Sequence, residues 1–341
     1  MDKDEVPLPL KVGIVYNLKK GIASDIEDIE AEYDSVDTVN SLKDIFTKAG
    51  IDVVLLEADA FFMDRIKSVK VDLIFNIAEG AGGRGREGQV PAILSFLNIP
   101  FSGSDATTLC MALDKALTKR YLRSFAIKSP KSQVINCFDY HLDSKLKFPL
   151  IVKPNCEGSS KGISNLAIAY DRKQLKALIN KNLDIYKMPM LAEEYITGRE
   201  FTVGIVGNGE DAKVFEPMEI YFLDKSNKET IYSYEVKKNF EKCVKYICPP
   251  VMDKALIEEM KKIALNVYNA MECKDFTRMD FRMTENGEIY FIELNPLPGL
   301  APNYSDLCIL AEMCGTSYND LIMTVLKSAI KRLNIEGAIR K

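Results

Sequence analysis

Short apolar runs alternate with amphipathic segments over the first hundred residues. Runs rich in β-branched residues at Lys11–Tyr16, Ile51–Leu56 and Val71–Asn76 predict three strands. Apolar residues at helical spacing predict helices over Asp34–Ala49 and Gly88–Leu97. This alternation of strand and helix is typical of a parallel sheet.

The rest of the chain mixes the two patterns without a repeat or a low-complexity linker. We expect a helix over Asp114–Phe125, strands over Pro149–Pro154, Gly162–Ala169 and Glu200–Val206, and an amphipathic helix over Asp253–Met271. The chain should therefore form three closely packed units, which we place at residues 1–104, 105–193 and 194–341, the last with a polar loop at about 223–243.

A hairpin is predicted at Asn286-Gly287, because a two-residue turn needs positive φ at both positions and this pair provides it. In the resulting register Asp280 lies opposite Glu293, and Arg278 lies opposite Asn295. Side chains alternate between the faces of a strand, so these four share one face. The opposite, core-facing side is expected to carry Met279, Phe281, Ile292 and Leu294.

Two carboxylates that face each other destabilise a sheet, and a hard divalent cation would remove that cost. Magnesium prefers carboxylate oxygens together with substrate phosphates, and an amide carbonyl can complete the set. We therefore expect Asp280, Glu293 and Asn295 to bind Mg²⁺. The alternative is a solvated polar face.

Composition narrows the chemistry further. The chain has 341 residues and a formal net charge of −4, which argues against nucleic acid as a partner. It lacks the run of about 18 apolar residues that a membrane span needs. One histidine, His141, and eight cysteines without a CxxC pair argue against histidine-dependent nucleophiles and zinc. Reduced cysteines indicate a cytoplasmic protein, and catalysis must rely on carboxylates, Lys, Arg and a metal.

A strand followed by a small-residue loop runs over residues 151–162. The strand carries Lys153, and Gly158-Ser159-Ser160 then offers backbone N–H groups that can surround anionic oxygens. A strand rather than a helix is predicted to follow, so this is not a Walker A loop. A surface hairpin is the alternative.

Acidic and basic residues lie on both sides of this loop in the sequence. Glu193 and Glu200 are acceptors suited to the amine of adenine and the hydroxyls of ribose, although a solvated acidic turn fits them equally well. Lys115 begins a positively charged helix, in which we interpret Lys119 and Arg123 as a solvated face.

Taken in order, five segments resemble the ATP-grasp superfamily and, within it, the D-alanine–D-alanine ligase family. They are Asp114-Lys115, VKPNCEGSSKG (152–162), EEYITGRE (193–200), TRMDFR (277–282) and IELNPLPG (292–299). The resemblance covers about Val71 to Arg332. It implies a three-domain ATP-grasp fold of α/β and α+β class, with an N-terminal Rossmann-like parallel sheet and ATP held between the central and C-terminal units.

The resemblance also implies an ATP- and Mg²⁺-dependent carboxylate–amine ligase, which forms an amide or dipeptide bond through an acyl phosphate. ATP would be bound by Lys115, Lys153, Ser160, Glu193, Tyr195, Ile196 and Glu200. Two Mg²⁺ ions, with Mn²⁺ as an alternative, would be held by Asp280, Glu293 and Asn295. The catalytic groups would be Arg278 and the Gly299 N–H at the oxyanion, Ser159 beside the first substrate, and Lys237 on the closing loop. Ser305 would meet the carboxylate of the second substrate.

Departures from the family pattern fall on the side that binds the first substrate. Glu79 stands where a histidine is expected, Arg84 where an acid is expected, and Lys238 where the loop carries a tyrosine. The glutamate that holds the substrate ammonium has no secure counterpart, and Glu32 and Asp34 are the nearest candidates.

Arg84 and Arg86 suggest a hypothesis about the first substrate. Arginine favours planar anionic partners, so this substrate would carry an additional carboxylate or phosphate, or lack the free ammonium. The alternative is that both arginines pair with Glu79 and Glu87 in an internal ion-pair cluster.

The expected partners are small-molecule carboxylate and amine substrates, namely amino acids. Members of the family are often dimeric, so the resemblance allows a homodimer. One alternative is the same mechanism on an L-amino acid or a secondary-metabolite acid. The other is a nucleotide-binding module without catalysis, against which the presence of Arg278, Asp280, Glu293 and Asn295 argues.

Overall fold

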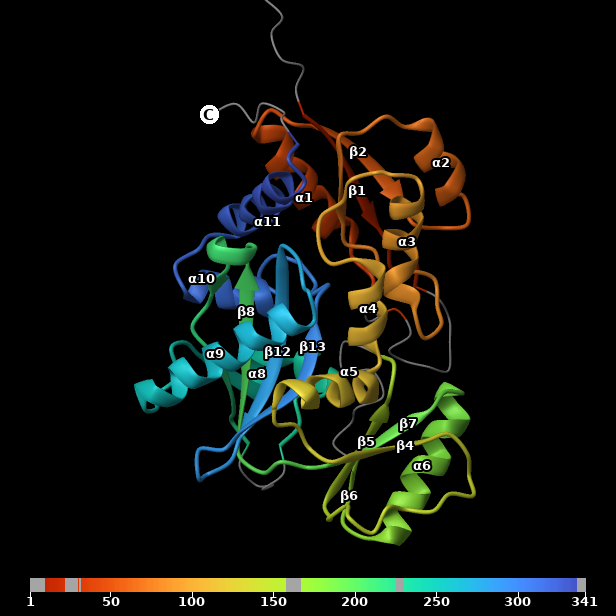
Figure 1. Ribbon diagram of the computed structural model, residues 1–341, viewed down its shortest axis with the longest axis vertical. Coiled ribbons are helices and arrows are strands. Elements are labelled where there is room, and N and C mark those ends of the chain that lie inside the picture. Colours follow the sequence, from red (N-terminus) through yellow and green to blue (C-terminus); the bar gives the residue numbers. More distant parts are fainter. Residues whose placement is uncertain (1–9, 22–29, 31, 158–166, 225–229, 336–341) are drawn as a thin grey trace, which may run out of the picture.

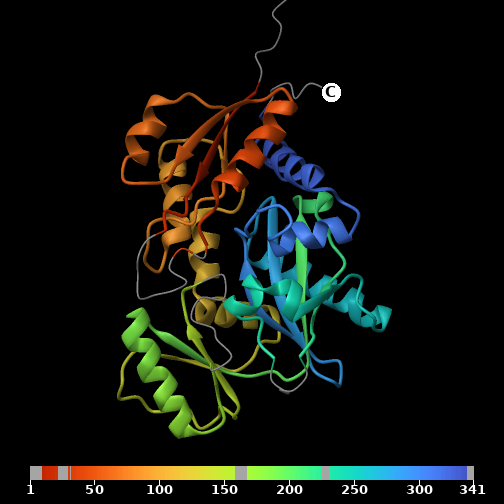
Figure 2. The same cartoon turned by 180° about the vertical axis from the view of Figure 1, so that it is seen from behind.

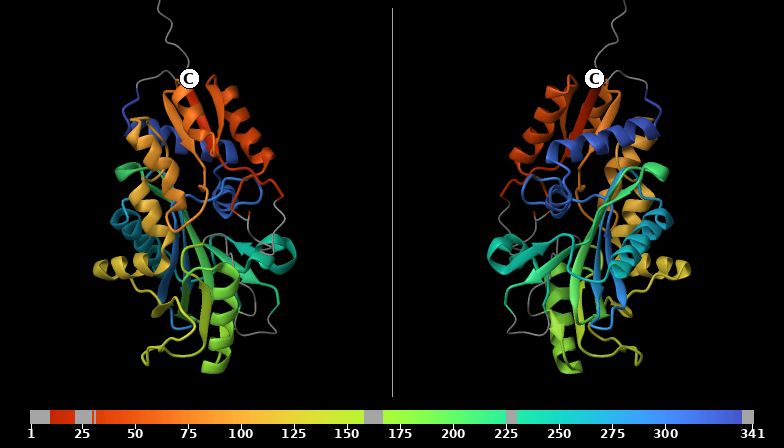
Figure 3. Two further views of the ribbon diagram at one scale, coloured as in Figure 1. Left: turned by 90° about the vertical axis from the view of Figure 1, so that its right-hand side faces the viewer. Right: turned by 90° about the vertical axis from the view of Figure 1, so that its left-hand side faces the viewer.

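The computed structural model describes residues 10–21, 30, 32–157, 167–224 and 230–335. Three sheets follow one another along the long axis of the molecule (Figures 1 and 3). The N-terminal sheet and the central sheet lie at opposite ends, and the C-terminal sheet lies between them. Among the described helices, none is long and apolar enough to cross a membrane.

The N-terminal sheet is parallel, in the order β2-β1-β3. Its strands are β1 (Lys11–Tyr16), β2 (Asp52–Glu57) and β3 (Leu73–Asn76), which confirms the three predicted strands. Ser35 caps the first helix by accepting a hydrogen bond from the Thr38 N–H. The helices of this unit are α1 (Val36–Lys48), α2 (Phe62–Ser68) and α3 (Gln89–Phe96); only the seven-residue α2 was not predicted.

Two short helices connect this unit to the others. α4 (Ala106–Leu113) runs toward the centre of the molecule, and α5 (Lys115–Leu122) leaves it in a new direction (Figure 1). Asp114 makes this corner because its extended backbone ends α4, while its carboxylate accepts from the Leu117 N–H and so caps α5. The corner fixes where Lys115 begins its helix.

The central sheet is antiparallel, in the order β4-β7-β5-β6, and α6 covers one of its faces (Figure 2). Its own apolar core lies between sheet and helix and includes Val152, Leu175 and Met190. The elements are β4 (Ser132–Ile135), β5 (Leu150–Pro154), β6 (Ile168–Ala169), α6 (Arg172–Tyr186) and β7 (Met190–Glu194). The strand predicted over Gly162–Ala169 lies partly outside the described residues.

The C-terminal sheet has the order β11-β10-β8-β12-β13, with β9 paired to β8. Its strands are β8 (Arg199–Val206), β9 (Lys213–Val214), β10 (Met218–Phe222), β11 (Val244–Ile247), β12 (Phe276–Met283) and β13 (Ile289–Asn295). The helices after β10 are α7 (Tyr234–Lys238), α8 (Phe240–Cys243), α9 (Lys254–Ala270), α10 (Asp306–Met313) and α11 (Tyr318–Arg332).

The two ends of the chain share one apolar core. α11 lies beside α1 (Figure 1), and Leu42 and Phe46 belong to the same buried cluster as Val325 and Leu326. A second cluster joins α9 to the C-terminal sheet and also takes in Leu122 of α5. The division into units at residues 104 and 193 stays a prediction.

The turn of the β12–β13 hairpin differs from the predicted one. The Gly287 N–H donates to the Thr284 carbonyl at 3.0 Å, and the Thr284 N–H donates to the Glu288 carbonyl at 3.0 Å. Of the pair Asn286-Gly287, only Gly287 has a positive φ, at 81°. The prediction of a two-residue turn with two positive φ angles was therefore wrong.

The expected pairing at the site is nevertheless confirmed, because an irregularity in the sheet restores it. Near the turn Phe281 pairs with Phe291, and the register shifts between Asp280 and Phe281. Ile292 is the extra residue of this bulge, so Asp280 again pairs with Glu293. Arg278 consequently pairs with Asn295, as expected.

The bulge changes which residue of β13 enters the core. Phe291 is 1% exposed and packs edge-to-face on Phe281, with ring centroids 6.1 Å apart. Ile292, which was predicted on the core side, is only half-buried and lines a cavity instead. A bulge thus turns one apolar residue toward the site.

We predict that Phe291→Ala destabilises the protein by about 3–5 kcal/mol, because it empties a fully buried ring site. Ile292→Ala should cost only about 1 kcal/mol, because this side chain lies at a cavity wall. Urea unfolding of both variants measures the difference. A larger loss for Ile292→Ala would indicate the continuous register without a bulge.

Candidate active site

Two cavities meet between the sheets. The first, of about 420 Å³, lies between residues of the N-terminal unit and the segment after β13. The second, of about 70 Å³, lies between the central and C-terminal sheets. Four side chains line both cavities, and all of them are charged: Lys237, Arg278, Glu293 and Asp306.

Arg278 lies at this junction between two carboxylates. Its Nη1 donates to Asp306 at 2.7 Å and its Nη2 to Asp280 at 3.0 Å. Burial opposes the charge of Arg278, but the two carboxylates outweigh this and raise its pKa above the ordinary value. Arg278 is therefore a permanently charged side chain in the lining of both cavities.

Asp280 and Glu293 face each other across the strands as predicted, and each has its own cation. Glu293 lies 3.3 Å from the Lys115 ammonium, while Asp280 is held by Arg278 and accepts from the Thr202 hydroxyl at 2.7 Å. Burial alone would raise the pKa of Glu293, but the nearby cations, Lys115 first among them, outweigh it and lower the pKa to about 2. The repulsion expected between the two acids is thus offset by cations of the protein itself.

Burial and the neighbouring Glu293 raise the pKa of Asp280, although Arg278 works in the opposite direction. The carboxylate pair therefore still favours an additional cation. Its donors, two carboxylates and the Asn295 amide, are all oxygens, which fits Mg²⁺.

Asp306 is a site residue that the sequence interpretation missed. It is 2% exposed and accepts from Arg278, from the Lys237 ammonium at 3.0 Å and from the Tyr232 hydroxyl at 3.0 Å. Burial is outweighed by Lys237 and Arg278, so its pKa lies below the ordinary value. It directly follows Ser305, which was selected, but nothing in the sequence pairs it with Arg278.

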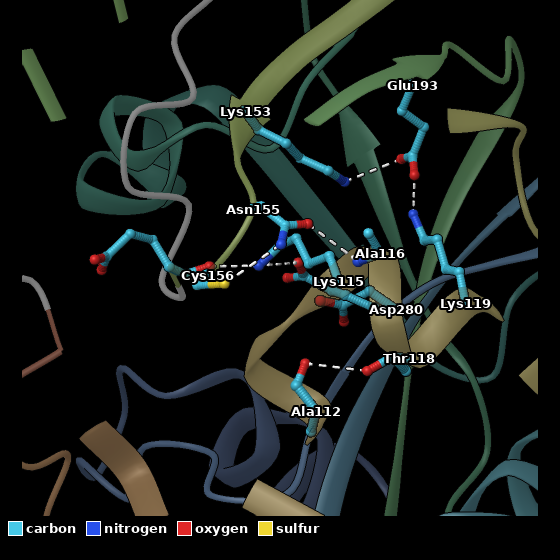
Figure 4. Close-up of polar contacts among 12 residues, drawn as sticks. Ala112, Lys115, Ala116, Thr118, Lys119, Lys153, Asn155, Cys156, Glu193 and Asp280 are labelled. Atoms are coloured by element: carbon cyan, nitrogen blue, oxygen red, sulfur yellow. Dashed lines mark hydrogen bonds and ion pairs between the residues drawn. The ribbon is translucent and has the colours of Figure 1, made fainter. Parts of the chain in front are cut away.

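The loop after β5 holds the start of α5. Asn155 donates to the Asp114 carboxylate at 2.8 Å, and its backbone carbonyl accepts from the Lys115 N–H at 3.0 Å (Figure 4). The Lys115 ammonium contacts the carbonyl of Glu157. Lys115 is thereby directed at Glu293, close to the junction.

Glu193 lies between two lysines. Lys153 contacts one of its oxygens at 3.0 Å, and Lys119 contacts the other (Figure 4). The side chains of all three are at most 4% exposed. The interpretation of Lys119 as part of a solvated face was therefore wrong, whereas Arg123 is exposed as expected. Burial lowers the pKa of Lys153 to about 8.

Five of the seven residues expected to bind ATP line the second cavity, whereas Lys115 lines the first and Ser160 is outside the described residues. These five are Lys153, Glu193, Tyr195, Ile196 and Glu200. Burial is the main cause that raises the pKa of Glu200 to about 7. The structure therefore brings together the central and C-terminal residues that the sequence selected.

Gly299 and Ser305 line the first cavity, near its junction with the second. The Ser305 hydroxyl accepts from the Ala301 N–H at 3.0 Å. A Cβ atom at Gly299 would lie only 2.9 Å from the Ser305 oxygen, so this close approach favours glycine. The expected positions of both residues are compatible with substrate contact.

Arg86 is paired within the protein through both terminal nitrogens, whereas its buried Nε has no hydrogen-bond partner among the described residues. Its Nη2 lies 2.7 Å from both oxygens of Glu32 and 3.4 Å from Glu157, and its Nη1 donates to the Cys156 carbonyl at 2.9 Å. Glu87 is more distant, at 3.9 Å. Arg86 therefore forms an internal cluster, but with Glu32 and Glu157 as its nearest acids.

Arg84 points elsewhere. It forms an ion pair with Asp114 at 2.7 Å, its side chain is 69% exposed, and it does not line either cavity. Lys238 is also exposed and outside both linings. The two serines of the small-residue loop, Ser159 and Ser160, lie outside the described residues.

Glu79 is an acid of this region whose carboxylate has no partner among the described residues, and the Asp34 carboxylate, which lines the same cavity, has none there either. Glu79 is 9% exposed and lines the first cavity, and within the described part of the chain its carboxylate has no hydrogen bond or ion pair. Oxygens of Glu32, Glu79 and Glu87 lie within 4.8 Å of one another. Burial, with Glu32 and Glu87, raises the pKa of Glu79.

The chain is similar to known proteins over most of its length. Residues 125–327 match the family model "D-ala D-ala ligase C-terminus". The D-alanine–D-alanine ligase of Bordetella avium is 30% identical over 84% of this chain and 86% of its own length. That of Thermotoga petrophila is 30% identical over 88% of this chain and 92% of its own.

A solved structure shows the same fold. The D-alanine–D-alanine ligase of Bacillus anthracis complexed with ATP superposes with a TM-score of 0.74 at 22% identity, covering 96% of this chain and all of that one. The fold class expected from the sequence is thereby confirmed.

We predict that Asp306→Asn lowers the free energy of unfolding at pH 7 by about 3–5 kcal/mol, because buried Arg278 and Lys237 lose a shared carboxylate. The pKa of Asp306 is lowered in the fold, so its contribution is complete at neutral pH and is lost only in acid. Urea unfolding measures the loss. The matched control is Asp211→Asn in the exposed pair with Lys331, which should change little; equal losses would contradict the buried network.

Proposed function

Because the chain belongs to the D-alanine–D-alanine ligase family of ATP-grasp enzymes, we propose that it is an ATP- and Mg²⁺-dependent carboxylate–amine ligase that acts through an acyl phosphate. One observation carries this proposal: the two cavities share Arg278, Lys237, Glu293 and Asp306. A terminal phosphate from one cavity and a carboxylate from the other would meet at these charges.

ATP would occupy the second cavity. Glu193 would accept from the adenine amine, the backbone at Tyr195 and Ile196 would line the base, and Glu200 would bind the ribose. Lys115 and Lys153 would bind the phosphates, to which Ser160 is expected to contribute. At about 70 Å³ the cavity is smaller than a nucleotide, so binding requires it to widen.

Mg²⁺ would be held by Asp280, Glu293 and Asn295, and it would neutralise the charge that develops on the phosphates. Two such ions, or Mn²⁺ in their place, are part of the proposal. Lys115 would pass from Glu293 to a phosphate when ATP binds, which frees this carboxylate for the metal.

The protein groups then support two transfers. A substrate carboxylate attacks the γ-phosphorus, ADP leaves, and an acyl phosphate forms. A free amine attacks its carbonyl, and Arg278 and the Gly299 N–H would hold the oxyanion before phosphate leaves. Ser305 would bind the carboxylate of the amine substrate, and Ser159 would lie beside the first substrate. Water would hydrolyse the acyl phosphate, so a closing loop is useful.

The first substrate carries an ammonium group in this proposal. Arg86 is neutralised by Glu32 and Glu157, and Arg84 is turned toward Asp114, so neither offers a free cation to an additional carboxylate. Glu79 instead presents an unpaired carboxylate to the cavity. An amino acid fits this end, and the relatives' names make D-alanine the first one to test.

Several expectations stay predictions. Lys237 is on the segment at about 223–243 that is expected to close over ATP, and Lys238 is expected to contact substrate. The following also stay predictions: a contact of Arg84 with substrate, a homodimer, a cytoplasmic location, and the lack of nucleic-acid or membrane partners.

The reaction predicts phosphate release from Mg·ATP when D-alanine, or another pair from a panel of D- and L-amino acids and diacids, is supplied. Asp280→Asn should lower this rate by at least about a hundredfold while the circular dichroism spectrum is unchanged, because a metal ligand is lost. Glu285→Gln, an exposed change in the same hairpin, should have no effect. Normal turnover in Asp280→Asn would refute the metal assignment, and no release with any pair would refute ligation.

Glu79→Gln should raise the KM for the first amino acid by about tenfold with a smaller effect on kcat, because an ion pair to the ammonium is lost. The matching 2-hydroxy acid has no ammonium and should give the same KM with both enzymes. Steady-state phosphate release measures both constants. Preference for a diacid that lacks an ammonium would contradict the assignment and favour the additional-anion hypothesis.

A further inference from the structure

Lys119 is a buried cation for which the proposed reaction has no use. It lies in the last turn of α5, is 2% exposed and contacts the carboxylate of Glu193. It does not line either cavity, whereas its partner Glu193 lines the second one. An effect on the reaction would therefore pass through Glu193.

Glu193 links Lys119 to the nucleotide cavity. On the central sheet Glu193 of β7 pairs with Ile151 of β5, so Lys153, two residues further on, projects from the same face. Lys153 lies 3.0 Å from the second oxygen of Glu193 (Figure 4). One carboxylate thus holds two ammonium groups that come from different elements.

The triad of Lys119, Glu193 and Lys153 has more positive than negative groups. With both ammonium groups protonated, the triad carries two positive charges and one negative charge, and all three side chains are almost completely buried. Burial and the charge of Lys153 lower the pKa of Lys119, while its direct contact with the Glu193 carboxylate works in the opposite direction. Lys153 lines the second cavity and Lys119 does not. The excess positive charge is therefore available on Lys153, which faces the space expected to hold the nucleotide. Without Lys119, Glu193 and Lys153 would form a neutral pair, and removing a cation from such a pair is costly in a desolvated site.

We propose that Lys119 is a positioning residue, which balances the charge of Glu193 and thereby leaves Lys153 free to bind the phosphates of a nucleoside triphosphate. This inference rests on the proposed function, because it assumes that ATP binds in the second cavity. It goes beyond that function by assigning a role to a residue that lines neither cavity.

The first test compares ligands with and without phosphates. In Lys119→Met the dissociation constant of Mg·ATP, from calorimetry, should rise by about tenfold, since Lys153 is retained by Glu193. The constant for adenosine, from ligand-observed NMR titration, should change by less than about twofold, because the phosphate contact alone is affected. Lys119→Arg should retain ATP binding, and Arg120→Met, an exposed neighbour on α5, is the control.

The second test removes the charge that Lys119 is proposed to balance. Once Glu193→Gln has made the side chain neutral, loss of Lys119 should have no further effect on ATP binding. Glu193→Gln and the double variant Lys119→Met/Glu193→Gln should therefore share one dissociation constant for Mg·ATP. This comparison holds even if Lys119→Met alone does not fold.

The outcomes separate cleanly. Equal weakening of ATP and adenosine in Lys119→Met would indicate a structural role in the adenine pocket and overturn the proposal. A further loss in the double variant, or unchanged ATP binding in Lys119→Met, would also overturn it. Wild-type protein that binds no ATP would instead refute the proposed function, before any variant is compared.

Discussion

Buried charge in this molecule is tolerated because each carboxylate near the junction of the two cavities has a cationic side chain as a partner. Asp280 and Asp306 share Arg278, and Glu293 faces Lys115. An unpaired ion in such a site would lose its hydration without compensation. Asp306 also binds Lys237, so this carboxylate ties α10 to β12 and α7, while the pair of Lys115 with Glu293 ties α5 to β13.

In the proposed reaction the same pairing would make the site responsive to ligands. A triphosphate would replace the carboxylates as the partner of Lys115 and Lys153, since Glu293 would then bind the metal and Glu193 would keep Lys119. The acids would thus hold these two lysines in place until a ligand binds. Glu193, held by Lys119 as well as by Lys153, is the clearest example.

Where the first cavity is lined by Glu32, Glu79, Glu87 and Glu157, acids are not matched by an equal number of cations. Arg86 satisfies Glu32 and Glu157, but Glu79 and Glu87 leave an excess of acid around it. Burial is the main cause that raises the pKa of Glu87 to about 8, and Glu32 adds to it. Such a surplus of desolvated carboxylates favours a cationic group on the substrate. Arg84 and Arg86 do not make this region positive, because both are paired with acids of the protein.

The sequence by itself determined the elements and the chemistry that local patterns encode. Alternation and helical spacing located β1, α1, β5, β8 and α9, and the ordered motifs indicated the fold and the reaction class. Tertiary structure decided which charges meet. The ion-pair partners of Lys119, Arg84 and Arg86 lie tens of positions away in the sequence. Asp306 likewise reaches Arg278 only through folding. The β12–β13 register shows the limit most clearly, since the predicted turn was wrong and the bulge at Ile292 restored the pairing of Asp280 with Glu293. Side-chain period along a strand is a local property, whereas bulges and ion pairs are selected by packing and desolvation that involve the whole chain.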